Sequence, residues 1–184
     1  MLDNFDSFTY NLVDYFDQLN VMCRVIRNNQ PLKKITAYNY RGIVLSPGPG
    51  LPGNSGNLLE VLNHYHQKLP ILGICLGHQA IGEFFDAEIT RAIRPMHGKI
   101  SKVKVRQDYI FQGLPDEISV VRYHSLVLDR LPRVLETIGL TSNNEIMAIR
   151  HKMLNIRGLQ FHPEAILTEF GMDMLRNWVK FNAI

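Results

Sequence analysis

Along the first half of the chain, short apolar runs alternate with longer segments whose apolar residues recur at helical spacing. Residues 8–19 form the clearest predicted helix, which Asp6 or Ser7 is expected to cap. The pattern further predicts strands over 21–27, 42–45 and 71–74, and helices just after Pro31 and over 57–67 and 76–85. This alternation predicts an α/β fold with a parallel sheet, whose functional sites lie at the carboxyl ends of the strands.

From residue 87 to residue 149 the pattern changes to short β-branched segments separated by Pro, Gly and Asn. These segments predict antiparallel additions to the sheet over 100–105, 118–122, 134–140 and 146–150. A strand that returns to the main sheet is then expected over 156–161, and a closing helix over 167–181. No linker or repeat interrupts the pattern, so we expect a single domain over residues 1–184. Only Met1 and Leu2 precede the turn at Asp3, so the first strand is either very short or preceded by residues that this sequence lacks.

One thiol stands where an apolar run ends and a helical segment begins. The stretch Leu69-Pro-Ile-Leu-Gly-Ile-Cys-Leu-Gly-His-Gln79 contains Gly-x-Cys-x-Gly, the thiol form of the nucleophile-elbow pattern. Gly73 and Gly77 allow the close backbone approach that a sharp turn from strand to helix requires. Cys75 would face the positive end of a helix dipole there, which favours a thiolate. A buried structural cysteine fits this stretch about equally well, so a partner for the thiol decides between the two.

The segment Gln160-Phe-His-Pro-Glu164 supplies that partner. Pro163 favours an extended backbone at His162, and residues two apart on an extended chain point to the same side. Glu164 can therefore reach the imidazole, fix its tautomer and stabilise its charged form, while the other ring nitrogen faces the thiol. Nucleophile, base and orienting acid together predict a cysteine hydrolase or transferase. Alone, His-Pro-Glu fits an ordinary turn before a helix equally well.

Composition narrows the class of protein. The 184 residues are 46% hydrophobic and 20% charged, with a net charge of +3, as expected of an ordinary globular chain. The basic residues of 99–106 alternate with apolar ones, as on the exposed face of a strand, so a nucleic-acid partner is not expected. The two cysteines, Cys23 and Cys75, occur without a signal peptide, which predicts a cytoplasmic protein without disulfides. No apolar stretch approaches the roughly 18 residues of a membrane span.

Two further segments follow predicted strands. Ser46-Pro-Gly-Pro-Gly-Leu-Pro-Gly53 is stiff and glycine-rich, so its amides can approach a ligand closely, although a tight connector is the plainer alternative. Arg122-Tyr-His-Ser-Leu126 contains His124, which on its own is more typical of a structural histidine.

Taken in order, four of these segments resemble the motifs of the class I (triad) glutamine amidotransferases. They are Pro-Gly-Pro-Gly at 47–50, Gly-Ile-Cys-Leu-Gly-His-Gln at 73–79, Tyr-His-Ser-Leu at 123–126 and Gln-Phe-His-Pro-Glu at 160–164. The opening residues 2–12 and Met96-His-Gly-Lys99 are further similar to the glutaminase subunits of anthranilate synthase and aminodeoxychorismate synthase. The resemblance extends from the first residues to the terminal helix. It implies a three-layer fold with a flavodoxin-like parallel core sheet and antiparallel β additions.

Carried over position by position, the resemblance implies Cys75 as the nucleophile, His162 as the base and Glu164 as its orienting acid. Ala165 departs from the family, which commonly has serine after His-Pro-Glu, and a local effect is expected. The implied glutamine-binding and oxyanion positions are Gly48, Pro49, Gly50, Leu76 through its amide, Gln79, Ser125 and Leu126.

The resemblance also implies that the reaction is shared between two subunits. This chain would hydrolyse glutamine through a cysteine thioester and pass ammonia to a separate synthase subunit that acts on chorismate, without a cofactor or metal of its own and without a membrane partner. The segments 6–8 and 97–99 are candidates for that contact, although capping and turn roles fit them equally. We expect low glutaminase activity from the isolated chain.

Several alternatives remain open from the sequence. Anthranilate synthase and aminodeoxychorismate synthase both use chorismate, so the tryptophan branch, the folate branch or a chain serving both fits the motifs. A stand-alone hydrolase of γ-glutamyl amides would use the same triad without a synthase. A non-catalytic binding subunit is disfavoured by the intact Cys75, His162 and Glu164. The glutaminase parts of carbamoyl-phosphate, GMP and CTP synthases share the triad but lack the Asp-Asn-Phe-Asp-Ser-Phe-Thr opening at 3–9.

Overall fold

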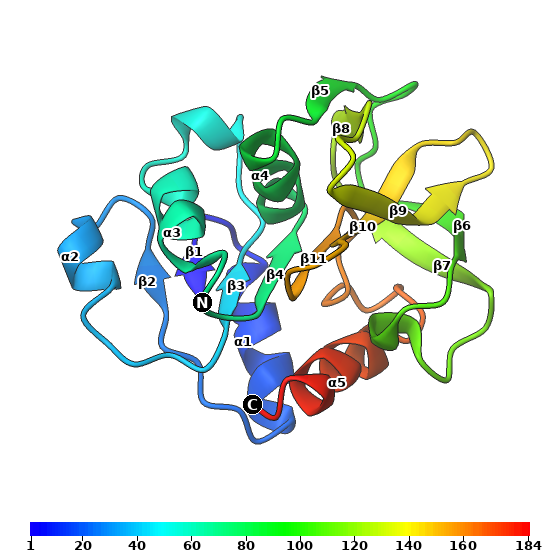
Figure 1. Cartoon of the computed structure of the whole chain (residues 1–184). Helices are drawn as coiled ribbons and strands as arrows, with labels where there is room; N and C mark the ends of the chain where they lie inside the picture. The colour runs from blue at the N-terminus through cyan, green and yellow to red at the C-terminus, as the bar shows by residue number, and fades with distance from the viewer.

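The computed structural model describes residues 1–184 and arranges them as a central sheet between two groups of helices (Figure 1). The strands of the central sheet are β1 (Leu2–Asp3), β2 (Ile26–Arg27), β3 (Ile43–Leu45), β4 (Ile71–Ile74), β6 (Lys99–Val105), β7 (Glu117–Arg122), β9 (Leu135–Thr141), β10 (Ile146–His151) and β11 (Ile156–Leu159). The helices are α1 (Thr9–Gln18), α2 (Leu32–Ile35), α3 (Leu58–Tyr65), α4 (Leu76–Phe84) and α5 (Gly171–Phe181), with short 3₁₀ turns η1 (Pro52–Asn54) and η2 (Tyr109–Phe111).

The central sheet has nine strands in the order β2-β1-β3-β4-β11-β10-β9-β6-β7. The strands from β2 to β11 are parallel, and those from β10 to β7 are added in antiparallel pairs. The α/β prediction with antiparallel additions is therefore confirmed. Two further strands, β5 (Glu88–Arg91) and β8 (Leu126–Asp129), pair with each other in a separate antiparallel sheet.

The neighbouring parallel strands β4 and β11 determine where a site can form. Ile71 to Ile74 lie opposite Ile156 to Leu159 in register. Cys75 follows directly after β4, and the Gln160 to Glu164 segment follows directly after β11. Because both segments leave the sheet at its carboxyl edge, side chains 85 residues apart in the sequence come together.

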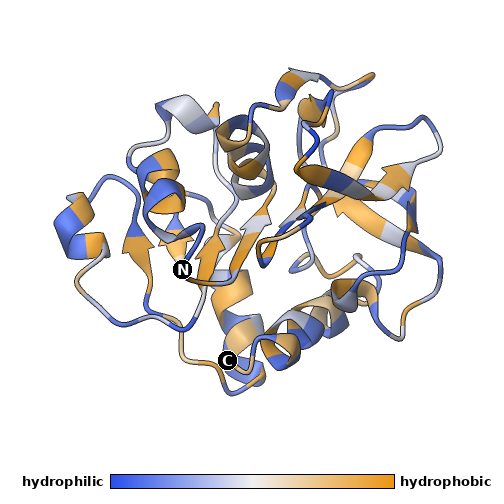
Figure 2. Ribbon diagram, in the orientation of Figure 1, coloured by the Kyte–Doolittle hydropathy of each residue, from blue (hydrophilic) through white to orange (hydrophobic).

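The core is divided between the two faces of the sheet, because successive residues of a strand point in opposite directions. Leu72 and Ile74 of β4 join a cluster with residues of α1 and α5, including the fully buried Trp178. Ile71 joins a second cluster with residues of α3 and α4, such as Leu62. Figure 2 shows apolar residues concentrated along the strands and on the inner faces of the helices. Figure 1 shows α1 and α5 on one side and α3 and α4 on the other.

Several predicted boundaries are wrong. The strand predicted over 21–27 contains only Ile26–Arg27, because its partner β1 has only two residues with which to pair. Helix α1 begins after Phe8 and has no side-chain cap; Asp6 instead accepts a hydrogen bond from the Phe8 amide at 2.8 Å. The closing helix begins at Gly171 rather than at residue 167. Strands β5 and β8 were not expected. No helix in the structure is both long and apolar enough to cross a membrane.

Candidate active site

Cys75 lies between the end of β4 and the first residue of α4, in a conformation that is rare for residues with a side chain. Its φ of 51° and ψ of −99° lie in positive-φ space, and the residue acts as the N-cap of α4. Such a conformation costs about 1–3 kcal/mol and persists only where the surroundings enforce it. Its amide donates to the Leu159 carbonyl at 2.8 Å, and its carbonyl accepts from the Gln79 amide at 3.0 Å. The turn predicted for a nucleophile elbow is therefore present.

The two glycines beside Cys75 are required by close packing. A Cβ on Gly73 would lie 2.4 Å from the backbone of Gly77, and a Cβ on Gly77 would lie 2.3 Å from the Leu45 carbonyl oxygen. No real Cβ tolerates such distances, so a larger residue at either position would push α4 away from β3 and β4. The glycines thus hold the helix N-terminus directly at the thiol.

The second group of the site comes from the chain that follows β11. His162 and Glu164 are both 2% exposed, and Nδ1 of His162 lies 2.7 Å from Oε1 of Glu164. The hydrogen bond predicted from their spacing is therefore present. With Nδ1 engaged in this way, the other ring nitrogen, Nε2, is the one left for chemistry. It is buried and makes no hydrogen bond in the structure.

The charge state of His162 reflects its two neighbours. Burial alone would disfavour the charged ring, but interactions with Cys75 and Glu164 outweigh burial and raise the pKa of His162 to about 10. His162 is therefore an imidazolium at neutral pH, next to the thiol. The thiol and Nε2 are close enough to interact but do not meet hydrogen-bond geometry, as is common for catalytic pairs before a substrate binds.

The imidazole is held by its backbone and by two aromatic rings. The His162 amide donates to the Val121 carbonyl at 3.1 Å, and its carbonyl accepts from the Thr168 hydroxyl at 2.7 Å. The ring centroid lies 5.3 Å from that of Phe8 and 5.2 Å from that of Tyr123, both in edge-on arrangements. The orientation of the ring is therefore set from several sides. None of these contacts could be inferred from a single motif.

The loop that follows β3 packs against the elbow. Within it, buried Ser46 accepts a hydrogen bond from the Asn4 amide at 2.9 Å, and its carbonyl accepts from the Asn4 side chain at 2.8 Å. A Cβ on Gly48 would lie 2.7 Å from the side chain of Leu76, so the loop backbone and the first residue of α4 are in close contact. The Leu76 amide is in the first turn of the helix, where no intrahelical acceptor exists. The loop and the helix N-terminus thus approach one another as an oxyanion hole would require.

The other implied binding positions differ in their surroundings. Gln79 is buried and donates through Nε2 to the Leu126 carbonyl and to Oε1 of Gln160, both at 3.1 Å. Leu126 therefore meets Gln79 through its backbone, not its side chain. Ser125 is exposed, with its carbonyl accepting from the Ala92 amide. Pro49 and Gly50 are exposed on the loop.

Sequence reasoning missed Gln160. Its side chain is fully buried, and its Nε2 lies 3.7 Å from Sγ of Cys75. The signal was present, because residues 160, 162 and 164 share one side of an extended chain, and the last two were selected on that basis. Phe8 and Tyr123 were also missed, although both lie in motifs that the sequence analysis quoted.

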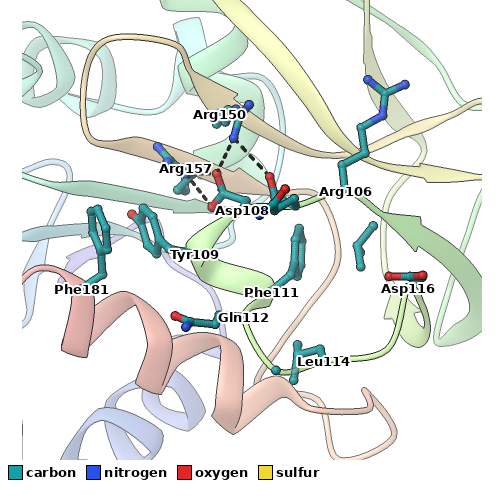
Figure 3. A pocket seen from close by; sticks show the side chains of 13 residues that line it. Arg106, Asp108, Tyr109, Phe111, Gln112, Leu114, Asp116, Arg150, Arg157 and Phe181 are labelled. Carbon is teal, nitrogen blue, oxygen red and sulfur yellow. Dashed lines mark hydrogen bonds and ion pairs between the residues drawn. The ribbon is translucent and has the colours of Figure 1, made fainter.

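A separate cavity lies away from this site. It measures about 860 Å³ and is bounded by η2, the start of β11 and the end of α5 (Figure 3). Its floor is an ion-pair cluster in which Asp108 accepts from Arg157 at 2.9 Å and from Arg150 at 3.3 Å. Arg157 is five residues before His162, or roughly 16 Å along an extended chain. Because these charges already pair with one another, we assign the cluster a structural role. No three His, Cys, Asp or Glu side chains are grouped as a metal site would need.

Comparisons with known proteins agree with this geometry. A family model described as glutamine amidotransferase class-I matches residues 1–181. Anthranilate synthase component 2 of Pseudomonas putida is 48% identical, with 98% of this chain and 95% of that protein covered. Aminodeoxychorismate/anthranilate synthase component 2 of Bacillus subtilis is 44% identical, with 98% and 94% covered. The crystal structure of a candidate GMP synthase component from Thermoplasma acidophilum superposes with a TM-score of 0.89 at 29% identity, covering 99% of this chain and 92% of that one. The chain therefore belongs to the class I glutamine amidotransferase family.

Proposed function

We propose that this chain is the glutaminase subunit of anthranilate synthase, which hydrolyses glutamine at Cys75 and delivers ammonia to a chorismate-using synthase subunit. The observation that carries the proposal is that Cys75, His162 and Glu164 come together, all buried, in a chain of the class I glutamine amidotransferase family. The relatives named for component 2 of this synthase support the choice of partner.

In the first chemical step, the Cys75 thiolate attacks the side-chain amide carbon of glutamine. The carbonyl oxygen becomes an oxyanion, and the amides near Gly48 and Leu76 would stabilise it by about 3 kcal/mol for each donor. The imidazolium of His162 gives its proton to the departing nitrogen. Ammonia leaves, and a γ-glutamyl thioester remains on Cys75.

The second step restores the enzyme. His162, now neutral, takes a proton from water as the water oxygen attacks the thioester carbon. The sulfur leaves as a thiolate, and glutamate is released. Glu164 keeps Nδ1 of the ring protonated, so that Nε2 is the atom that gives and takes protons. The chemistry of these steps uses no cofactor and no metal.

Glutamine recognition follows from the atoms that remain available. Both hydrogens of the Gln79 amide are already donated within the protein, so its Oε1 is the atom left to accept from the substrate's ammonium group. The exposed backbone around Ser125 and the Pro49–Gly50 turn would close over the rest of the amino acid. These roles are proposed from position and from family resemblance.

A groove beside the triad is the proposed docking surface for the synthase. It measures about 470 Å³, and among its lining residues are Phe8, Gly98, Tyr123 and Glu164. Each of the two segments expected to contact the partner, 6–8 and 97–99, contributes one residue to this groove, Phe8 and Gly98. Ile166 and Leu167, which also line the groove, are 93% and 62% exposed, so two adjacent apolar side chains are available to a partner. A synthase seated here would press on the segment that carries the buried Glu164, and through this segment partner binding would control glutaminase activity.

The main test uses Cys75→Ser in the reconstituted complex. Glutamine-dependent product should fall at least ~10⁴-fold, because the weaker nucleophile cannot form the thioester at neutral pH. Synthesis from added ammonium salt should continue, because the synthase subunit is intact. The matched control is Cys23→Ser, the other cysteine, which should retain both activities. Persistence of glutamine-dependent synthesis in Cys75→Ser would show that the nucleophile is misassigned.

The product separates the two branches. Anthranilate would establish the tryptophan branch and aminodeoxychorismate the folate branch, and a chain that yields both with the respective synthases would serve both. The name of the Bacillus subtilis relative covers both synthases, which supports including a chain that serves both branches among the alternatives.

Partner dependence separates an amidotransferase from a stand-alone γ-glutamyl hydrolase. We expect Ile166→Asp to weaken synthase binding at least tenfold, because it places a charge on the proposed contact surface. Met22→Asp, at a comparably exposed position in another region, is the control and should bind normally. Full glutamine turnover by the isolated chain, unchanged when synthase is added, would favour the hydrolase.

A further inference from the structure

A chain of buried hydrogen bonds ends at the sulfur of Cys75. It starts at the backbone carbonyl of Leu126, which accepts from Nε2 of Gln79 at 3.1 Å. The same Gln79 nitrogen donates to Oε1 of Gln160 at 3.1 Å. Nε2 of Gln160 then lies 3.7 Å from Sγ of Cys75, within reach of an N–H···S hydrogen bond. The Gln160 side chain is fully buried and Gln79 is only 4% exposed.

The Leu126 carbonyl determines which atom donates and which accepts in each of these hydrogen bonds. A carbonyl oxygen can only accept, so Gln79 must turn its NH₂ group toward Leu126. The second hydrogen of that NH₂ group is then donated to Gln160, which must accept it through its side-chain oxygen. Gln160 therefore has only its own NH₂ group to turn toward Cys75. The side-chain amide orientations follow from the backbone, and no alternative flip satisfies all three contacts.

The far end of the chain is anchored as well. The Leu126 carbonyl also accepts from Nδ1 of His124 at 2.9 Å, so Nε2 of His124 is free to accept from Nε of Arg122 at 3.0 Å. Arg122 in turn pairs with Glu145 at 2.7 Å, and both side chains are almost completely buried. The whole arrangement is rigid, because every member is held from two sides.

We propose that Gln160 is a catalytic residue of the glutaminase reaction, donating a hydrogen bond to the Cys75 sulfur and so stabilising its thiolate. This inference rests on the proposed function for the identity of the reaction, but the contact with the sulfur stands independently. A neutral donor suits this position. It stabilises a buried anion without introducing a second cation beside His162, and its carbonyl oxygen is satisfied by Gln79.

The contact also explains the sequence of the motif. In Gln-Phe-His-Pro-Glu, residues 160, 162 and 164 share one side of the extended chain, while buried Phe161 points into the core. The segment after β11 thus carries, in succession, the hydrogen-bond donor to the sulfur, the base and the acid that orients the base. Gln160 donates to the sulfur, and Glu164 contacts the base.

The experiment measures the reactivity of the thiol itself. In a Cys23→Ser background, so that Cys75 is the only thiol, the rate of alkylation by iodoacetamide is followed at pH 7 together with glutamine turnover in the complex. Gln160→Leu removes the donor while approximately keeping the volume, and we expect alkylation and kcat each to fall about tenfold. Gln160→Glu still accepts from Gln79 but turns an anion toward the sulfur, and about a hundredfold loss of both is expected.

Asp108→Asn is the control for general destabilisation, because it weakens the distant ion-pair cluster without touching the site, and its alkylation rate should match the parent. Unchanged alkylation in both Gln160 variants would overturn the proposal, even if turnover or melting temperature fell, since Gln160 would then act only by holding Gln79. Failure of the proposed function has a different signature: Cys75→Ser would keep glutamine-dependent activity whatever the alkylation rates show.

Discussion

Glu164 and Asp108 are both buried carboxylates paired with a nitrogen cation, yet their surroundings differ. Glu164 leaves Oε2 without a partner, and its partner His162 leaves Nε2 without one. Asp108 contacts Arg157 through both carboxylate oxygens, Arg150 through one, and the Ile110 amide through the other. Figure 3 shows how these side chains point toward one another beneath the cavity. One cluster keeps unused hydrogen-bonding capacity, and the other does not.

The cations differ as well. The imidazolium of His162, whose pKa is raised to about 10, carries a proton that it can release. Arg157 remains charged at any accessible pH, and its guanidinium also lies 4.4 Å above the Tyr109 ring. A site that moves protons therefore uses a group that can release its proton. A cluster that holds strands together uses groups that cannot. Cavity size alone would have selected the wrong one of the two.

Glu164→Gln tests the difference between the two carboxylates most directly. Glutamine turnover should fall roughly 10²–10⁴-fold, because the ring loses the anion that holds its tautomer and stabilises its charge. The free energy of unfolding should fall by less than it does in Asp108→Asn, because His162 can release its proton when the carboxylate is lost, whereas a buried arginine cannot. Steady-state kinetics and urea unfolding measure the two effects. A large loss of stability with turnover preserved would contradict the assigned roles.

Asp108→Asn should give the opposite result. Removing the carboxylate leaves Arg157 buried, charged and poorly paired, and we expect the free energy of unfolding to fall by about 3 kcal/mol. The kcat of the folded enzyme should stay within about twofold of the parent, because no group of the site contacts this cluster. Urea unfolding and kinetics at a temperature where the variant is folded are the measurements. A tenfold fall in kcat would show that the two regions are coupled.

The free energy of unfolding should depend on pH through buried histidines in the half of the molecule that contains the site. Burial lowers the pKa of His78 to about 3, and burial with Arg122 nearby lowers that of His124 to about 3. Between about pH 3 and 6.5 the unfolded chain therefore binds two more protons, and unfolding free energy should fall by about 2.7 kcal/mol per pH unit on acidification. His162, with its pKa raised to about 10, contributes stability below pH 6.5 that is lost as the pH rises toward 10.

These signs place maximal stability near pH 6.5, as far as these histidines determine it. His124→Gln should remove about half of the acid slope, or roughly 1.4 kcal/mol per pH unit, because one buried histidine no longer titrates on unfolding. Urea unfolding at pH 5 and pH 6 in the parent and in the variant measures the slope. Equal slopes would show that His124 does not carry the dependence.

The periodic part of the fold and the pairing of His162 with Glu164 could be predicted from the sequence, because both depend on local spacing. β4, α4 and the turn at Cys75 follow from one apolar run bracketed by glycines. The pairing of β5 with β8 was missed, because it joins Glu88–Arg91 to Leu126–Asp129, which are distant in the sequence and half polar. Gln160 was missed for a similar reason. Its role depends on Gln79, which lies 81 residues away and is itself oriented by a backbone carbonyl.

The smallest expected effects come from a matched pair of phenylalanines, one beside each cluster. Phe8 lies 5.3 Å from the His162 ring, whereas Phe181 is stacked on Tyr109 at 3.8 Å with the rings nearly parallel. Phe8→Leu should lower kcat about 3- to 10-fold at saturating synthase, because the imidazole loses an aromatic contact worth roughly 0.5–1.5 kcal/mol. Phe181→Leu should lower the free energy of unfolding by about 1 kcal/mol and leave kcat unchanged.

Each variant of this pair controls for the other, since the same atoms are removed at both positions. Both quantities are measured in both proteins, at a synthase concentration that saturates each, because Phe8 also lines the proposed docking groove. If Phe181→Leu lowered kcat as much as Phe8→Leu, the division between a proton-moving cluster and a structural one would not hold. If only Phe8→Leu lowered kcat, aromatic packing would affect catalysis only where it contacts a group that exchanges a proton.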